Sequence, residues 1–297
     1  MIAGIDLGGT QVRVAFARLD GQIQTVAKTK TILLGTPRHM VAWLADQVSR
    51  HGLVGRLKSV GIGAPGPVDV ERGILVNPPN LPHQPNLEGW QNTHLGELLG
   101  TAMDCPIHLQ NDATLAGWGE FHQGAGQGVR DMLYITWSTG VGGGLVLNGE
   151  LYAGAHGSAG EVGHMVLDPQ GPLCGCGQRG CLEAFCSGAN VFKQYGKSAV
   201  ELLRSSLEGD QEAREIIQRI AGHMGQGLVN LANLFDPELI VIGGGFTRSW
   251  GQLQPLLLAA LRSSPYIKRA RRPKLRRARL GDRGGLVGAV EWAKSHL

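Results

Sequence analysis

Two glycine-rich turns occur at corresponding places in the two halves of the chain, each directly after a short apolar segment with the alternation of a β-strand. Asp6-Leu7-Gly8-Gly9-Thr10 follows residues 2–5, and Ser138-Thr139-Gly140-Val141-Gly142-Gly143-Gly144 follows residues 132–137. Residues without a Cβ atom let backbone N–H groups approach a phosphate and its metal ion closely. A third cluster, Gly243-Gly244-Gly245, ends another predicted strand. The three turns indicate one nucleotide held between two lobes, and hairpin turns without a ligand are the alternative.

Hydrophobic periodicity predicts alternating strands and helices along the chain. Strands are expected at residues 2–5, 12–16, 23–26, 57–62, 106–109, 132–137, 143–147, 239–242 and 275–280, and helices at residues 40–48, 93–100, 112–121, 210–235 and 286–296. The segment 77–90 holds four prolines and is expected to be a loop. This order predicts an α/β protein. No low-complexity linker separates the halves, so we expect a small lobe at 1–110, onto which a C-terminal helix at 284–297 packs back, and a large lobe at 111–283.

The composition limits the class of protein. The chain has 297 residues, of which 42% are hydrophobic and 18% charged, values typical of globular proteins. It contains no apolar run of the about 18 residues that a spanning helix needs, and its N-terminus lacks the pattern of a signal peptide. These features predict a cytoplasmic protein without a membrane partner.

The net charge of +4 conceals one basic segment. Its positive residues are Lys268, Arg269, Arg271, Arg272, Lys274, Arg276, Arg277 and Arg279. Basic runs of this kind bind nucleic acid in some proteins, but no aromatic residue interleaves this one, and no helix-turn-helix or RNA-binding motif accompanies it. We therefore interpret the run as a solvated surface or a patch for an acidic partner, and expect no nucleic acid partner.

The segment Gly61-Ile62-Gly63-Ala64-Pro65-Gly66 satisfies the G-x-G-x-x-G pattern of dinucleotide-binding proteins. Pro65 and Pro67 prevent a helix from beginning at that turn, so the helix N-terminus that would bind a pyrophosphate is not expected. The chain also contains no G-x-x-x-x-G-K-[ST] sequence, which excludes a P-loop. A tight turn that brings backbone amides to a ligand is the remaining interpretation.

Asn111 and Asp112 lie between a predicted strand and a predicted helix. A carboxylate at a helix N-terminus has its ionised form stabilised by the helix dipole, as a general base requires. Aspartate is also a common N-cap residue. From the residues alone, both readings of Asp112 stay open.

Three of the five cysteines lie within eight residues, which is too close for a disulfide framework. Together with one nearby histidine they form a set of one imidazole and three thiolates, which suits a structural zinc ion. The predicted ligands are His164, Cys174, Cys176 and Cys181. Glu161 and Glu183 flank this set, so a folded knuckle would hold two carboxylates rigidly, and carboxylates accept hydrogen bonds from sugar hydroxyls.

The combined motifs resemble those of the ROK family of sugar kinases over essentially the whole chain. The motifs, in the order of the family, are Asp6-x-Gly8-Gly9-Thr10, Gly63-Ala64-Pro65-Gly66-Pro67, Asn80-Leu81, Asn111-Asp112, Thr139-Gly140-Val141-Gly142-Gly143-Gly144, Gly160-Glu161-Val162-Gly163-His164, the cysteine segment ending at Glu183, and Ser187-Gly188. Ser138 departs from the glycine that many members have there. The resemblance implies a two-lobed, actin-like (ribonuclease-H-like) ATPase fold with ATP and a sugar in the cleft.

The resemblance also implies roles for individual residues. Asp112 would be the general base that takes the proton from the sugar 6-hydroxyl. The sugar would be bound by Asn111, Asp112, Glu161, His164 and Glu183, assisted by Asn80 and the backbone of Gly66. Phosphates and Mg²⁺ would face Asp6, Gly8, Gly9, Thr10, Thr139 and Gly140, and the adenosine would face Gly244 and Gly245. His164 would use one ring nitrogen for zinc and the other for the sugar.

We therefore expect an ATP-dependent kinase that phosphorylates the 6-hydroxyl of glucose, with ATP, Mg²⁺ and a structural Zn²⁺. An N-acetylmannosamine, N-acetylglucosamine or broad-specificity hexose kinase is the alternative, because the space around the sugar C2 substituent is not readable from the sequence. A sugar sensor without catalysis is a more remote alternative, since a sensor needs no base. Repressors of the family carry an N-terminal DNA-binding domain, and here the phosphate motif begins at residue 6. The family resemblance also implies a homodimer or homotetramer.

Overall fold

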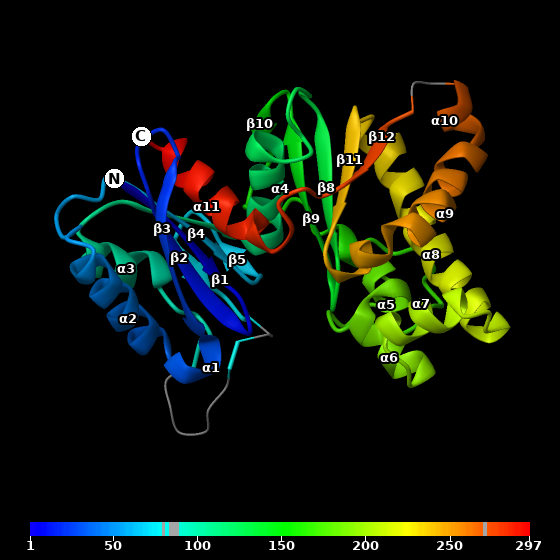
Figure 1. The fold of residues 1–297 in the computed structure, drawn as a ribbon, viewed down its shortest axis with the longest axis horizontal. Helices are drawn as coiled ribbons and strands as arrows, with labels where there is room; N and C mark the ends of the chain where they lie inside the picture. The colour runs from blue at the N-terminus through cyan, green and yellow to red at the C-terminus, as the bar shows by residue number, and fades with distance from the viewer. Residues whose placement is uncertain (79–80, 83–88, 270–271) are drawn as a thin grey trace. The chain divides into compact units, whose positions relative to one another are not determined.

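The computed structural model describes residues 1–78, 81–82, 89–269 and 272–297, with the backbone alone for residues 268 and 269. The chain forms two compact units (Figure 1). The first contains residues 1–127, 151–159 and 282–297, and the second contains residues 128–150 and 160–281.

The first unit is built on a five-stranded sheet with the order β3-β2-β1-β4-β7. Its strands are β1 (Ile2–Leu7), β2 (Gln11–Ala17), β3 (Ile23–Lys30), β4 (Val60–Ala64) and β7 (Ile107–Asn111), with a separate small pair of β5 (Val68–Asp69) and β6 (Ile74–Leu75). Its helices are α1 (Thr31–Leu34), α2 (Pro37–Arg50), α3 (Leu95–Met103), α4 (Asp112–Gln123) and α11 (Gly284–Lys294). The first three strands are an antiparallel meander, whereas β4 and β7 run parallel to β1, so the carboxyl ends of these parallel strands share one edge.

The alternation of side chains along β1 places apolar groups on both faces of this sheet. Ala3, Ile5 and Leu7 belong to the core formed with α2 and α3, whereas Ile2 packs with α11. Helix α11 lies close to the sheet because β1 and β4 carry glycines beneath it. A Cβ atom at Gly4 would lie 2.6 Å from the backbone nitrogen of Val290, a separation too short for any side chain.

Helix α4 packs against α11 within the first unit. A Cβ atom at Gly119 would lie 2.8 Å from the backbone nitrogen of Gly288, so these two helices approach at backbone contact distance. Helix α4, which was expected in a lobe at 111–283, lies in the same compact unit as α11.

The second unit repeats the strand arrangement of the first. Its sheet has the order β10-β9-β8-β11-β12, again with an antiparallel hairpin and two parallel strands. The strands are β8 (Met132–Trp137), β9 (Val141–Leu147), β10 (Glu150–Leu151), β11 (Leu239–Gly243) and β12 (Lys274–Arg277). The helices are α5 (Leu182–Cys186), α6 (Gly188–Tyr195), α7 (Ala199–Leu207), α8 (Gln211–Phe235), α9 (Trp250–Ser263) and α10 (Pro265–Arg269), preceded by one helical turn at Val162–His164.

Helix α8 follows the predicted pattern, with an apolar stripe that is buried along its whole length. Asp210 caps its N-terminus by accepting a hydrogen bond from the Ala213 N–H at 3.1 Å. The basic strand β12 lies at the edge of the sheet, where charged side chains discourage pairing with another chain. Among the described residues, no helix has both the length and the apolar character needed to cross a lipid bilayer.

Candidate active site and metal centre

The predicted site residues of the first unit lie along the carboxyl edge of its sheet. Asp6 on β1 pairs in register with Gly63 on β4, and the next residue of β4 pairs with Asn111 at the end of β7. A Cβ atom at Gly63 would lie 3.4 Å from the Cα atom of Asp112. Because Gly63 has no side chain, the beginning of α4 lies close to β4. Asp6, Asn111 and Asp112 therefore lie along the same edge of the sheet.

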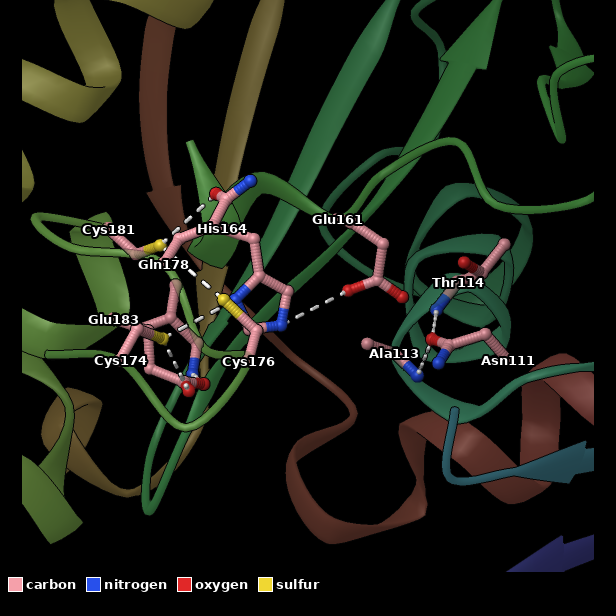
Figure 2. Close-up of polar contacts among 11 residues, drawn as sticks. Asn111, Ala113, Thr114, Glu161, His164, Cys174, Cys176, Gln178, Cys181 and Glu183 are labelled. Carbon is pink, nitrogen blue, oxygen red and sulfur yellow. Dashed lines mark hydrogen bonds and ion pairs between the residues drawn. The ribbon is translucent and has the colours of Figure 1, made fainter. Parts of the chain in front are cut away.

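The Ala113 N–H donates to Asp112 Oδ1 at 2.7 Å, but the N-cap of helix α4 is the side chain of Asn111 (Figure 2). Its Oδ1 atom accepts hydrogen bonds from the Ala113 N–H at 2.9 Å and from the Thr114 N–H at 3.1 Å. Asp112 is therefore the first helical residue, where the N-terminal end of the helix dipole stabilises a carboxylate. The open question of whether Asp112 serves as the N-cap is answered by the position of Asn111.

Asp6 is 7% exposed and is paired with Arg13 of the adjacent strand. The Arg13 Nη2 atom lies 2.6 Å from Asp6 Oδ2, and the Nη1 atom donates to the carbonyl of Asp282 at 2.5 Å. Burial raises the pKa of the Asp6 carboxyl above its usual value, and the Arg13 guanidinium opposes this shift. Sequence reasoning did not identify Arg13, although the hairpin register places it directly opposite Asp6.

The turn between β1 and β2 has two consecutive amides that form no hydrogen bond within the described residues. The Gly8 N–H donates to the Gln11 carbonyl at 2.9 Å, and the Thr10 carbonyl accepts from the Thr31 N–H at 2.9 Å. Within the described chain, the N–H groups of Gly9 and Thr10 have no acceptor. Both residues are exposed, so this turn offers a pair of adjacent donors suited to a phosphate oxygen.

The corresponding turn of the second unit, between β8 and β9, has the same property. The Ser138 N–H donates to the Gly140 carbonyl at 2.9 Å. The N–H groups of Thr139 and Gly140 donate to no acceptor in the part of the chain that the structure describes. The two hairpins that the sequence singled out thus share one feature, a pair of consecutive free amides.

The third glycine cluster lies against this second hairpin. Gly244 has a φ of +84°, in the region that favours glycine, and its backbone lies against that of Trp137. A Cβ atom at Gly245 would lie 3.5 Å from Ser138 Oγ, and the rings of Trp137 and Phe246 stack with centroids 4.3 Å apart. The second and third glycine turns are therefore adjacent, as one nucleotide site within this unit requires.

The predicted metal ligands come together. The donor atoms of His164, Cys174, Cys176 and Cys181 lie within 4.8 Å of one another (Figure 2). His164 Nδ1 is 3.6 Å from Cys174 Sγ, and the Sγ atoms of Cys176 and Cys181 are 3.7 Å apart. A tetrahedral zinc ion with Zn–S of about 2.3 Å and Zn–N of about 2.05 Å separates its sulfur atoms by about 3.8 Å, and a sulfur from a nitrogen by about 3.6 Å. The four side chains fit a zinc ion.

The chemistry of the thiols supports the same conclusion. Burial and hydrogen bonds from the neighbouring thiols raise the pKa of Cys181 to about 12. Three thiolates would not coexist at these distances without a cation to neutralise them, whereas zinc binds thiolates. A bound zinc ion would thus hold four residues of an otherwise irregular segment in place.

The two nitrogens of His164 face different groups. The Nδ1 atom faces Cys174, whereas the Nε2 atom lies 4.0 Å from Glu161 Oε2. The side chains of His164 and Glu161 are both partly exposed. The imidazole therefore has one nitrogen directed at the metal cluster and one directed at an accessible carboxylate. Figure 2 shows Glu161 on the side of this ring opposite the cysteines, with a carboxylate oxygen directed at Nε2.

Glu183 connects the cysteine cluster to the second hairpin. Its Oε2 atom accepts a hydrogen bond from the Val141 N–H at 2.9 Å, and its Oε1 atom lies 4.0 Å from Cys174 Sγ. A Cβ atom at Gly140 would lie 2.8 Å from the same Oε2 atom, so a side chain at this position would displace the Glu183 carboxylate. The contact of Glu183 with the hairpin is a feature that the sequence motifs did not indicate.

Two remaining predicted residues lie near the proline-rich segment. Gly66 lies two residues after the end of β4 and is partly exposed, with a cis peptide bond to Pro67. Asn80 lies outside the described residues.

Comparison with known proteins places the whole chain in one family. The profile of the ROK family matches residues 2–296. A glucokinase of Halalkalibacterium halodurans is 31% identical, over 96% of this chain and 92% of its own, and an N-acetylmannosamine kinase of Yersinia pestis is 31% identical, over 99% and 98%.

Two solved structures cover nearly the full chain. The ROK hexokinase of Thermus thermophilus is similar with a TM-score of 0.86 and 35% identity, covering 99% of this chain and 98% of its own. A ROK family glucokinase from Streptomyces griseus, solved in complex with glucose and AMPPNP, is similar with a TM-score of 0.78 and 29% identity, covering 99% of both chains. These likenesses confirm the expected actin-like α/β fold class, and the chain belongs to the ROK family.

Proposed function

We propose that this protein is an ATP-dependent glucokinase, which transfers the γ-phosphate of ATP to the 6-hydroxyl of glucose. The observation that carries this proposal is the pair of hairpin turns, each with two consecutive free amides, on strands of two units with the same topology. Such amides suit the phosphates of a nucleotide. The glucose specificity is supported by the full-length similarity to glucokinases, one of them solved with glucose and AMPPNP.

Each of the two hairpins is proposed to bind phosphate groups of the donor. The free amides of Gly9, Thr10, Thr139 and Gly140 would bind phosphate oxygens, and Gly8 would allow the close approach of the first turn. Gly244 and Gly245 would accommodate the adenosine beside the second hairpin. Mg²⁺ prefers carboxylate and phosphate oxygens, and Asp6 is the carboxylate next to the first turn that would hold it. When bound, the ion neutralises phosphate charge.

The sugar is proposed to be bound by polar side chains whose remaining donors and acceptors would face its hydroxyls. Asn111 accepts two backbone hydrogen bonds through Oδ1, which leaves its amide nitrogen as a donor for a hydroxyl. Glu161 and the Nε2 atom of His164 form an accessible polar pair. Glu183 would complete the set, with Gly66 and Asn80 assisting.

Asp112 is the proposed general base. Its carboxylate takes the proton of the sugar 6-hydroxyl as that oxygen forms a bond to the γ-phosphorus, and the bond from phosphorus to the β,γ-bridging oxygen breaks to release ADP. The position at the start of α4 keeps the carboxylate ionised, which a base requires. Phosphoryl transfer depends chiefly on positioning and charge neutralisation, so one base and a set of donors suffice.

A zinc ion at His164, Cys174, Cys176 and Cys181 would be structural. Four protein ligands close the coordination sphere, so the ion would supply no open position for substrate. Its proposed contribution is to fix the ring of His164 and the segment leading to Glu183.

The test is a coupled assay of ADP release with Mg-ATP and glucose, mannose, fructose, N-acetylglucosamine or N-acetylmannosamine, comparing kcat/KM. The highest kcat/KM with glucose is expected. A preference for an N-acetylhexosamine would mean that the protein is a kinase but that its substrate is not glucose. The similarity to an N-acetylmannosamine kinase makes this the second candidate function. Sugar binding without turnover on any sugar would favour a sensor instead.

The protein is also proposed to form a homodimer or homotetramer, as the family resemblance implies. Light scattering coupled to gel filtration would measure its mass in solution.

A further inference from the structure

Three hydrogen bonds attach the second hairpin to the segment that follows the last zinc ligand. The Ser138 carbonyl accepts from the Gly188 N–H at 2.8 Å, and the Thr139 carbonyl accepts from the Ala189 N–H at 3.0 Å. The third bond is the one from the Val141 N–H to Glu183. All donors and acceptors belong to the second unit, so this connection is internal to it.

These bonds determine where the free amides of the hairpin point. In a trans peptide, the carbonyl of one residue and the N–H of the next lie in one plane and point in opposite directions. The carbonyls of Ser138 and Thr139 are directed into the first turn of α6, so the N–H groups of Thr139 and Gly140 are directed the other way. The contact with α6 thus orients the two amides proposed to bind phosphate.

The anchoring segment has little stability of its own. Helix α5 has five residues and no side-chain cap, and isolated helices of this length are unstable in water. It begins at Cys181, which is its N-cap. At its other end, Asn190 Nδ2 donates to the Glu183 carbonyl at 3.2 Å and to Ser187 Oγ at 2.8 Å, which joins α5 to α6. The position of α5 and of the first turn of α6 therefore depends on tertiary contacts, of which the placement of Cys181 is one and the bond from Trp137 Nε1 to the Cys186 carbonyl, at 2.7 Å, is another.

We propose that the zinc site and Glu183 position the phosphate-binding amides of Thr139 and Gly140, so that metal loading sets the affinity for nucleotide even when no sugar is bound. The proposal rests on the proposed function, in which this hairpin binds the donor phosphates. Glu183 acts here as a positioning residue, through the Val141 N–H, in addition to its proposed contact with sugar.

The first test removes the metal and measures nucleotide binding without sugar. Two zinc-free samples are titrated with AMPPNP by calorimetry. The first is wild-type protein that has been stripped with a chelator, desalted and returned to Mg²⁺. The second is the variant Cys176→Ser, which changes an exposed ligand. Both are expected to bind AMPPNP at least about tenfold more weakly than zinc-loaded protein, and zinc is expected to restore the stripped wild type. The matched control Cys105→Ser changes a half-buried thiol outside the cluster and should bind normally. Zinc-free protein with unchanged AMPPNP affinity would overturn the proposal.

The second test addresses the carboxylate without disturbing the metal ligands. Glu183→Ala removes the acceptor of the Val141 N–H, whereas Glu183→Gln keeps a side-chain oxygen at that place. In zinc-loaded protein without sugar, Glu183→Ala is expected to weaken AMPPNP binding about fivefold or more, and Glu183→Gln by no more than about twofold. Equal affinities in wild type and Glu183→Ala would contradict the proposed link, and this result remains measurable if Cys176→Ser fails to fold.

The outcomes separate this inference from the proposed function. If zinc-loaded wild type binds no AMPPNP and phosphorylates no sugar, the proposed function fails. If wild type is active and binds AMPPNP with an affinity that depends on neither zinc nor Glu183, the proposed function stands and only the link between the metal site and the hairpin fails.

Discussion

Asp6 and Arg13 face each other across the β1–β2 hairpin, with Arg13 Nη2 2.6 Å from Asp6 Oδ2. The carboxylate is almost fully buried, so its charge depends on this one cation for compensation. A Mg²⁺ ion held by Asp6 would therefore compete with, or add to, an existing ion pair.

Replacing Arg13 by methionine is expected to destabilise the fold. The substitution leaves the Asp6 carboxylate buried without a partner, and breaking a buried pair in this way costs about 2–4 kcal/mol. Urea unfolding measures the loss. Arg18→Met in the turn between β2 and β3, where the guanidinium bonds to Gln22 on the surface, is the matched control and should change stability by less than about 0.5 kcal/mol. An equal effect of both substitutions would show that Asp6 does not depend on Arg13.

Asn111 is expected to have two separable roles. Asn111→Ala removes the cap of α4 and should cost about 1 kcal/mol of stability. Asn111→Asp keeps an oxygen that accepts from the Ala113 and Thr114 N–H groups but loses the amide donor. We therefore expect Asn111→Asp to unfold like wild type and to show a KM for glucose raised about tenfold or more, which is the loss of one hydrogen bond to a hydroxyl.

Unfolding curves and glucose KM values for both variants check this separation. A normal glucose KM in Asn111→Asp would leave the residue with a capping role alone.

The elements with a clear hydrophobic period were the ones that the sequence could predict. Helix α8 and the strands β8 and β11 were expected within a few residues of their observed bounds, because their apolar residues repeat with the period of a helix or a buried strand. Helices α5 and α6 were not expected, since five or eight residues carry too few repeats to define a period. Strand β12 ends at Arg277, before the predicted residue 280.

Contacts between distant segments were the part that the sequence could not supply. The close approach of α4 and α11 depends on Gly119 and Gly288, which no local pattern connects. Arg13 was missed for a different reason, because its pairing with Asp6 follows only once the exact register of the hairpin is known. The cluster of four residues that could hold a metal ion was predictable because their donor types and spacing are rare in any other role.

Substitution of Asp112 tests the proposed base. Asp112→Ala should lower kcat by about 10²–10⁴-fold, the usual contribution of a general base, while glucose binding measured by calorimetry changes little. Asp46→Ala is the matched control, because this exposed carboxylate pairs with Arg50 on α2 and belongs to no predicted site. An Asp112→Ala enzyme with nearly normal kcat would exclude this carboxylate as the base.

Acid is expected to destabilise the first unit through His108. Burial, together with the stacked ring of His296, lowers the pKa of His108 to about 4 in the folded protein. The unfolded chain has the ordinary pKa of about 6.5, so it binds a proton more readily than the folded one below that pH. The stabilisation by neutral His108 is thus complete above about pH 6.5 and is lost as the pH falls from 6.5 towards 4. Because the ring is only half-buried, we expect a loss of about 1–2 kcal/mol.

Thermal unfolding from pH 7.5 to 4.5 measures this loss. His108→Phe keeps a ring that stacks on His296 but cannot take up a proton, so its Tm should fall less steeply over this range than that of wild type. His51→Phe is the matched control, since this exposed histidine contacts Phe16 and has its Nδ1 atom bonded to the Gln47 carbonyl. Burial also lowers the pKa of His122, so this residue contributes part of the acid sensitivity in every variant. Parallel Tm curves for wild type and His108→Phe would show that protonation of His108 does not govern the acid response.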